Sequence, residues 1–461
     1  MRRNMYSQNP EPLADASDTP QSSPWTAAMA STVGSVLEYY DFFVYGPMAA
    51  LVFGTIFFPS SDPGVATLLA LLTFAVGFVA RPLGGVVIGH FGDRIGRKKM
   101  LMLTFFITGG VTVGIGCLPT FAQIGVWAPI LLVTLRFIQG FGLGGEWGGA
   151  ALLAVEHAPE GKRGFFGSLV QAGAPLGVIL SSAVVALVTL MPREDLLTWG
   201  WRIPFLLSIV LVIFGLVLRM RLTETPDFEK AKDVQSQKKM PLVVALRRYP
   251  AQILSMIGLH VTDTTLGFMQ GVFVLGFATT TLGISATTAL IANISASVAN
   301  LIVTPLAGAI ADRIGPRRVL VTAIVVLALW AFPMFWLMET KSVLALFIVM
   351  TSNGMIVGTL FSQQASLFAK VLDPTVRYTG MSVGFQTATV IGGGFGPLIA
   401  QALQNSAGGA TWSISTYLVI VALIGLVSSI YLTSQRASQK AHGSTPAEPT
   451  LQLTTTGLKE S

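Results

Sequence analysis

Apolar residues dominate the chain in long runs that are separated by short polar segments. A run of about 20 residues forms a helix that is long enough to cross the hydrocarbon core of a bilayer, at about 1.5 Å per residue. The pattern therefore predicts an all-α integral membrane protein. The twelve expected membrane-spanning segments cover approximately residues 28–58, 65–91, 101–119, 125–153, 164–190, 202–220, 251–280, 287–311, 319–338, 343–369, 378–404 and 412–433.

One long charged connection divides these segments into two sets of six. It reads RLTETPDFEKAKDVQSQKKMPLVVALRRYP and follows the sixth segment. We therefore expect a six-helix bundle over residues 25–220, a cytoplasmic loop over 221–250 and a second six-helix bundle over 251–433. Residues 1–24 are polar and proline-rich, and the tail 434–461 is polar, so both are expected to be disordered.

The composition agrees with a chain that faces lipid. Charged residues make up 11% of it, hydrophobic residues make up 52%, and the mean hydropathy is +0.68; a soluble protein carries roughly 25% charged residues. The single cysteine, Cys117, excludes an intramolecular disulfide and is expected to be packed among apolar neighbours. Because the histidines lack metal-ligand spacing and no GxxxxGK[ST] motif occurs, we expect no metal, nucleotide or other cofactor.

Basic residues indicate how the chain is oriented in the membrane. Most of the 29 Lys and Arg residues fall in the two tails, the central connection and the turns on the same side, whereas the opposite side holds Arg193, Arg202 and Lys341. Lys and Arg collect on the cytoplasmic side, so both termini are expected in the cytoplasm. The net charge of +7 then reflects orientation, and no nucleic-acid partner is expected.

A short glycine-containing basic turn occurs twice. Residues 89–99 read GHFGDRIGRKK and residues 308–318 read GAIADRIGPRR, each after the second helix of a six-helix half. Glycine lets helix ends approach closely, and Asp and Arg side chains can bridge or cap those ends. We predict a gate between the halves; the alternative is a turn that is merely tight and basic. The gate residues are Gly89, Asp93, Arg94, Gly96, Arg97, Asp312, Arg313 and Gly315.

Several ionisable residues lie within the expected spans, where a charge is costly and therefore indicates function. Glu38 and Asp41 share one face of the first helix, and Arg136 of the fourth helix lies at a similar depth. Adjacent carboxylates repel each other while a nearby arginine stabilises their charge, so such a group can take up and release a proton. We predict that Asp41 carries the proton, with Arg136 as its switchable partner and Glu38 as a second candidate. The alternative is a static ion pair.

Other polar residues fall at depths suited to a gate or a substrate cavity. Arg81 and Glu146 lie nearer the inner ends of their helices, and we expect them to pair with each other in the gate. The candidate substrate-binding residues are Tyr39, Tyr40, Arg136, Trp147, Gln171, His260, Asp263 and Gln386. Further uncharged candidates, equally suited to binding helices together, are Asn293, Asn300, Asn353, Gln363 and Gln364. For an anionic substrate, Arg136 is the expected charge complement.

Several longer stretches carry a family resemblance. They are EYYDFFVYG (38–46), FVARPLGGVVIGHFGDRIGRKKMLML (78–103), RFIQGFGLGGEWGGAALLAVEHAP (136–159), WGWRIPFLLS (199–208), VRYTG and GFQTATVIGGGFGPLIA (376–400). The chain resembles the major facilitator superfamily, and more specifically its metabolite–proton symporter branch. Its first half is most similar to shikimate transporters.

The resemblance implies a function and a location. It implies the major facilitator fold, in which two six-helix halves enclose the substrate near mid-membrane. It further implies proton-coupled uptake of a small organic acid, such as shikimate, across the bacterial inner membrane. It supports Asp41 and Arg136 as a coupled pair. The expected partners are a small-molecule substrate, protons and the lipid bilayer, and the carrier is expected to be monomeric.

Other functions stay open at this point. Related carriers transport aromatic acids, dicarboxylates, or proline and betaine. An efflux antiporter would resemble exporters with a G-P-x-x-G-G motif on the fifth helix, of which GSLVQAGAPLGVILSS (167–182) has only a part. A membrane enzyme is not supported, because no nucleophile–base pair can be assembled.

Overall fold

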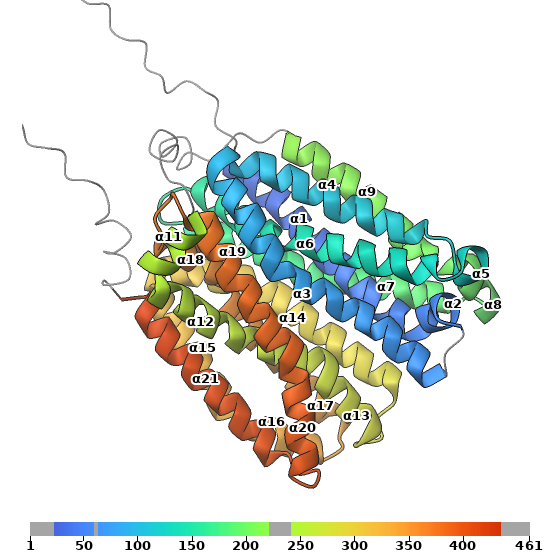
Figure 1. Ribbon diagram of the computed structural model, residues 1–461. Helices are drawn as coiled ribbons and strands as arrows, with labels where there is room; N and C mark the ends of the chain where they lie inside the picture. The colour runs from blue at the N-terminus through green and yellow to red at the C-terminus, as the bar shows by residue number, and fades with distance from the viewer. Residues whose placement is uncertain (1–22, 60–62, 221–240, 435–461) are drawn as a thin grey trace, which may run out of the picture.

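The computed structural model describes residues 23–59, 63–220 and 241–434, which form a bundle of helices (Figure 1). Every element within these residues is helical. Ten of the described helices are long and apolar enough to cross a membrane, or up to twelve if each of two bent pairs counts as one span. The predicted all-α membrane fold is confirmed. The expected disorder at the two ends concerns residues that lie outside the described ones, apart from a few at each boundary.

The first half contains six spans, close to the predicted segments. They are α1 (Pro24–Met48) with η1 (Ala49–Phe53) and α2 (Gly54–Phe57), α3 (Pro63–Ile95), α4 (Arg97–Gly116), α6 (Trp127–Glu156), α7 (Arg163–Thr189) and α9 (Arg202–Met220). The short elements α5 (Phe121–Ile124), α8 (Arg193–Asp195) and η2 (Leu196–Gly200) lie in the connections.

The second half repeats this arrangement. Its spans are α12 (Pro250–Phe268) with η3 (Met269–Val274) and α13 (Leu275–Thr280), α14 (Ala286–Ile314), α15 (Pro316–Trp330) with α16 (Pro333–Glu339), α17 (Val343–Ser362) with α18 (Gln364–Lys370), α19 (Arg377–Ala388) with η4 (Thr389–Phe395) and α20 (Gly396–Ser406), and α21 (Trp412–Leu432).

The expected central loop over 221–250 contains a short helix in its last part. Residues Pro241–Arg248 form helix α11, which packs on α19 and α3, and residues 221–240 lie outside the described ones. In PLVVALRR the apolar side chains recur at helical spacing, and Ala245 is fully buried. The amphipathic pattern therefore forms a helix as soon as a neighbouring surface can cover its apolar face.

The repeated basic turn connects two helices in each half and explains why glycine recurs in it. Gly96 joins α3 to α4 with φ 125°, and Gly315 joins α14 to α15 with φ 92°. A side chain rarely adopts such a positive φ, whereas glycine adopts it without steric cost. We call the end of the bundle that carries these two turns the basic end.

Replacement of Gly315 by alanine tests this conformational requirement. A Cβ there would meet no atom within 4 Å, so the cost comes from the backbone alone, about 1–3 kcal/mol. We expect Gly315→Ala to lower the midpoint of thermal unfolding in detergent. The matched control is Gly110→Ala, at an uncrowded position inside α4, which should leave the midpoint unchanged or raise it. An equal midpoint for both variants would contradict the interpretation.

The two halves come into close contact near the basic end. Helix α7 packs along α14, and α3 packs along α19. A Cβ on Gly164 would lie 2.9 Å from the Gly308 carbonyl oxygen, and a Cβ on Gly89 would lie 2.8 Å from Thr379 Cα. Small residues on facing helices therefore bring backbones of opposite halves into contact.

Candidate functional site

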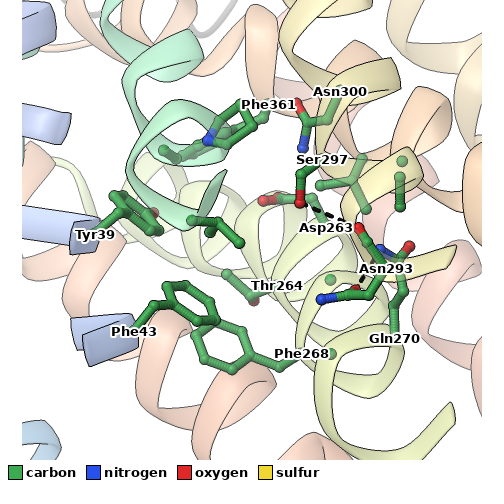
Figure 2. Close-up of a pocket in the computed structure, with 18 of the residues that line it drawn as sticks. Tyr39, Phe43, Asp263, Thr264, Phe268, Gln270, Asn293, Ser297, Asn300 and Phe361 are labelled. Carbon is green, nitrogen blue, oxygen red and sulfur yellow. Dashed lines mark hydrogen bonds between the residues drawn. The ribbon is translucent and has the colours of Figure 1, made fainter. Parts of the chain in front are cut away.

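A cavity of about 130 Å³ lies between the two halves. Helices α1 and α7 of the first half and α12, η3, α14 and α17 of the second half supply its lining (Figure 2). Aromatic rings of Tyr39, Phe43 and Phe268 lie on one side, and Asn293 and Asn300 of α14 lie on another. The position between the halves is the one that the repeat predicted for a substrate site.

His260 and Asp263 of α12, two of the candidate substrate-binding residues, both line this cavity. His260 Nδ1 lies 3.2 Å from the Asp263 carboxylate, and His260 Nε2 lies 3.1 Å from Thr389 Oγ1. Gln364 Nε2 donates a hydrogen bond to Asp263 Oδ1 at 2.5 Å. A histidine next to a carboxylate can donate or accept hydrogen bonds, so this group can recognise substrate hydroxyls or exchange a proton.

A smaller cavity adjoins the first and holds Glu38 and Arg81. Arg81 Nη1 lies 3.4 Å from Glu38 Oε1, and both side chains are at least 90% buried. The predicted pair of Arg81 with Glu146 is wrong. Glu146 Oε1 instead accepts a hydrogen bond at 2.8 Å from Arg219, at the end of α9. Counting residues gives depth along a helix but not the direction in which a side chain points, so depth alone paired the wrong groups.

Asp41 lies inside the first half and does not line either cavity. Thr112 donates to Asp41 Oδ2 at 2.5 Å, Gln139 Nε2 donates to Thr112 Oγ1 at 2.6 Å, and Arg136 Nη1 donates to Gln139 Oε1 at 2.5 Å. A chain of hydrogen bonds therefore connects Asp41 with Arg136, its expected partner. Arg136 also lies over the Tyr45 ring, with Cζ 3.7 Å from its centroid.

The sequence does not single out Thr112 and Gln139, because an uncharged side chain in a membrane helix costs little energy and so does not by itself indicate function. One signal was available. Gln139 follows Arg136 by three residues, so the two side chains share a helix face.

The other substrate candidates lie outside the larger cavity. Tyr40 donates a hydrogen bond to the Pro204 carbonyl within the first half. Trp147 Nε1 donates to Gln171 Oε1 at 2.8 Å, and the Trp147 ring stacks on Phe385 at 3.7 Å between centroids. Gln171 and Gln386 reach across the halves to the carbonyl oxygens of Phe361 and Leu143, respectively. Of the further candidates, Asn353 accepts a hydrogen bond from Trp330, and Gln363 donates to the Ala307 carbonyl.

At the basic end, the two repeated aspartates each cap a helix of the opposite half. Asp93 accepts hydrogen bonds from the Tyr378 and Thr379 amides and from Thr379 Oγ1 at 2.7–3.1 Å, at the start of α19. Asp312 accepts from the Gly164 and Phe165 amides, both at 2.8 Å, at the start of α7. Because a helix N-terminus carries exposed amides and a partial positive charge, each carboxylate stabilises this closed contact.

The arginines of the repeat differ in their roles. Arg97 pairs with Glu156 of α6, and Glu156 also accepts a hydrogen bond at 2.7 Å from Arg377 of α19. The second copy has Pro316 where the first has Arg97, so this bridge exists in the first copy only. Arg94 and Arg313 are exposed, so they do not belong to the buried contacts of the predicted gate. Glu156 and Arg377 do not stand out in the sequence, because both lie at helix ends, where charges are common.

Comparisons with known proteins agree with this architecture. The model of the family "Sugar (and other) transporter" matches residues 26–242, and that of the "Major Facilitator Superfamily" matches residues 253–459. The chain is 44% identical over 422 residues to the shikimate transporter of Escherichia coli (strain K12), covering 89% of this chain and 95% of that protein.

Two further proteins extend the comparison. The chain is 33% identical over 436 residues to the proline/betaine transporter of Salmonella typhimurium (strain LT2), covering 92% of this chain and 86% of that protein. The solved structure of the proton:xylose symporter XylE superposes with a TM-score of 0.71 at 17% identity, covering 89% of this chain and 95% of that one, which supports the fold alone. The chain therefore belongs to the major facilitator superfamily, as a multi-pass membrane protein that transports small molecules and is not an enzyme.

Proposed function

We propose that the protein is a proton-coupled symporter that imports a small organic acid, such as shikimate or a related carboxylate, by alternating access. The observation that carries the proposal is the set of buried carboxylates, Glu38, Asp41 and Asp263, in or near cavities between the two halves. A buried acid that gains and loses a proton can link the proton gradient to substrate movement. The 44% identity to a shikimate transporter supports this substrate class.

The orientation follows from the charge distribution. Because Lys and Arg favour the cytoplasmic side, we place the basic end and both termini in the cytoplasm of a bacterial cell, with the protein in the inner membrane. We propose separately that the carrier is a monomer. The helix caps at Asp93 and Asp312 then close the cytoplasmic side. In this conformation the cavity serves substrate that arrives from the opposite side of the membrane.

The transport cycle uses these contacts in turn. Protonation of Asp41 weakens the hydrogen bond that it accepts from Thr112. The change passes through Gln139 and alters the contacts of Arg136. This rearrangement, together with bound substrate, favours release of the caps at the basic end. The site then faces the cytoplasm, and the substrate and the proton leave. Coupling requires that the substrate bind the protonated carrier more tightly than the deprotonated one.

A second candidate substrate is a zwitterion such as proline or betaine. The rings of Tyr39, Phe43 and Phe268 and the carboxylate of Asp263 line one cavity, and such groups attract a quaternary or secondary ammonium. The 33% identity to a proline/betaine transporter favours the same class. The two candidates differ in net charge, which makes them easy to separate.

The test is uptake of radiolabelled shikimate into proteoliposomes under an imposed inward proton gradient. We expect accumulation above the external concentration that collapses when a protonophore is added. Unlabelled glycine betaine should not compete. Absence of shikimate uptake, with uptake of labelled betaine by the same vesicles, would replace the first candidate by the second. Uptake that is insensitive to the protonophore would contradict proton coupling.

A further inference from the structure

The two cavities adjoin each other, and a single arginine lines the smaller one. They share Tyr39, Thr264 and Phe268 in their linings. Among the described residues that line either cavity, Arg81 is the only Lys or Arg. Arg136, the cation that the sequence suggested for an anionic substrate, does not line either of them. The charge complement for a carboxylate must therefore be sought at Arg81.

Arg81 has unused capacity to bind an anion. Within the described part of the chain, its polar contact is the 3.4 Å hydrogen bond to Glu38, which is longer than the usual 2.7–2.9 Å of a charge-assisted bond. The guanidinium also lies near the rings of Phe42 and Phe78, with Cζ 5.2 and 5.4 Å from their centroids. A guanidinium carries five N–H donors in a fork that suits a carboxylate, so one long bond leaves most donors available.

We propose that Arg81 binds the substrate carboxylate and that protonation of Glu38 releases Arg81 for this contact. The inference rests on the proposed function as a carrier of an organic acid, and it identifies where that acid group binds. It also gives Glu38 a role different from that of Asp41. Glu38 controls substrate affinity at the cavity, whereas Asp41 acts on helix contacts inside the first half.

Charge balance is the physical reason for coupling at this site. With Glu38 ionised, the pair with Arg81 is neutral, and an arriving carboxylate would leave two anions to share one cation in a buried site. Such repulsion is strong where the effective dielectric constant is low. A proton on Glu38 leaves Arg81 with a net positive charge that the substrate neutralises. Proton and substrate anion therefore favour each other's binding by the same factor.

The neighbouring charges do not supply a competing partner. Glu146 of α6 and Arg219 of α9 act on Glu38 at longer range, but they are paired with each other at 2.8 Å. Arg136 of α6 acts on Arg81 from inside the first half. Across the cavity, Asp263 is engaged by His260 and Gln364. The Glu38–Arg81 pair is thus the group whose charge the substrate can change.

The larger cavity would hold the part of the substrate beyond its carboxylate, namely the ring and its hydroxyl groups. A ring whose carboxylate lies at Arg81 would pass Tyr39, Thr264 and Phe268, which line both cavities, and would enter the space beside α14. There the side-chain amides of Asn293 and Asn300 offer donors and acceptors for hydroxyl groups. The arrangement fits a hydroxylated carboxylate with a small ring better than a purely apolar acid.

The test measures binding of shikimate and of its methyl ester to purified protein at mildly acidic and mildly alkaline pH. Wild type should prefer the acid over the ester and should lose affinity for the acid as the pH rises. Arg81→Gln should bind shikimate about 10- to 100-fold more weakly and the ester almost unchanged. Glu38→Gln, which mimics the protonated residue, should keep its affinity for shikimate at alkaline pH. Arg193→Gln, at an exposed position of α8, is the control for loss of one positive charge.

Each outcome separates the inference from the proposed function. Wild type that binds neither compound would overturn the proposed substrate and the inference with it. Wild-type binding combined with an unchanged preference for the acid in Arg81→Gln would overturn the inference alone. If Arg81→Gln also fails to bind the ester, the variant is misfolded and Glu38→Gln becomes the deciding test. An affinity of Glu38→Gln for shikimate that falls with pH as in wild type would refute the role of Glu38 and the inference.

Discussion

Asp41→Asn strongly lowers proton-driven accumulation of substrate, while exchange of labelled for unlabelled substrate across the membrane continues. Asparagine keeps the size of the side chain and can still contact Thr112, but it cannot exchange a proton. A pH difference of about two units drives roughly 100-fold accumulation when one proton is coupled, because each unit corresponds to a factor of ten. We therefore expect the accumulation ratio in proteoliposomes to fall by at least about tenfold, and any accumulation that remains and is lost in the double variant Asp41→Asn/Glu38→Gln is driven by the proton at Glu38.

Counterflow exchange is the essential control for this prediction, because it needs a working substrate site and a moving carrier but no proton gradient. Asp195→Asn, at an exposed position of α8, is the matched variant and should accumulate substrate like wild type. Full accumulation by Asp41→Asn would show that the driving proton binds elsewhere, with Glu38 and Asp263 as the next residues to replace. Loss of both accumulation and exchange would indicate a structural role for Asp41.

Glu156→Gln opens the basic end. The Glu156 carboxylate contacts Arg97 of α4 and Arg377 of α19, so it connects the two halves. Arg97 is fully buried, and removing the charge of its carboxylate partner costs roughly 3–5 kcal/mol. Part of this free energy is lost only in the closed conformation, because the contact between Glu156 and Arg377 forms only when the two halves meet. Every 1.4 kcal/mol shifts the ratio of closed to open carriers tenfold.

Thiol labelling can detect this opening. Ala365 is fully buried and packs against Gly167 between the halves, so Ala365→Cys reports access to the basic end. Cys117, which is exposed and not packed as we expected, is first replaced by serine. In detergent, Glu156→Gln should raise the rate of maleimide labelling at least tenfold. The exposed Glu160→Gln at the same end should not. Equal rates in the two variants would refute the role of Glu156 as a connection between the halves.

The membrane-spanning helices followed from the sequence because they depend on local physics. An apolar run of about 20 residues must satisfy its backbone hydrogen bonds internally in lipid, and a helix does so wherever the neighbouring helices lie. The same holds for the repeated turn. Gly96 and Gly315 take positive φ values that follow from the short connection between two helices. These features need no knowledge of tertiary contacts.

Partners across the bundle could not be predicted in the same way. Asp93 caps α19 through Thr379, 286 residues later, and Asp312 caps α7 through Gly164, 148 residues earlier. The sequence predicted that these aspartates bridge or cap helix ends, but it carried no signal for which ends. Arg81 shows the same limit, because its depth was compatible with Glu146 while its direction brought it to Glu38.

The sequence by itself determined the class of this protein, its two six-helix halves, and the residue types that cost energy in a membrane and so indicate function. Only the tertiary structure decided which of those residues meet, because pairing depends on the rotation and packing of each helix against its neighbours. It separated Asp41, inside the first half, from Glu38, one helical turn away at a cavity. Two carboxylates that the sequence places side by side thus face different partners and can perform different tasks.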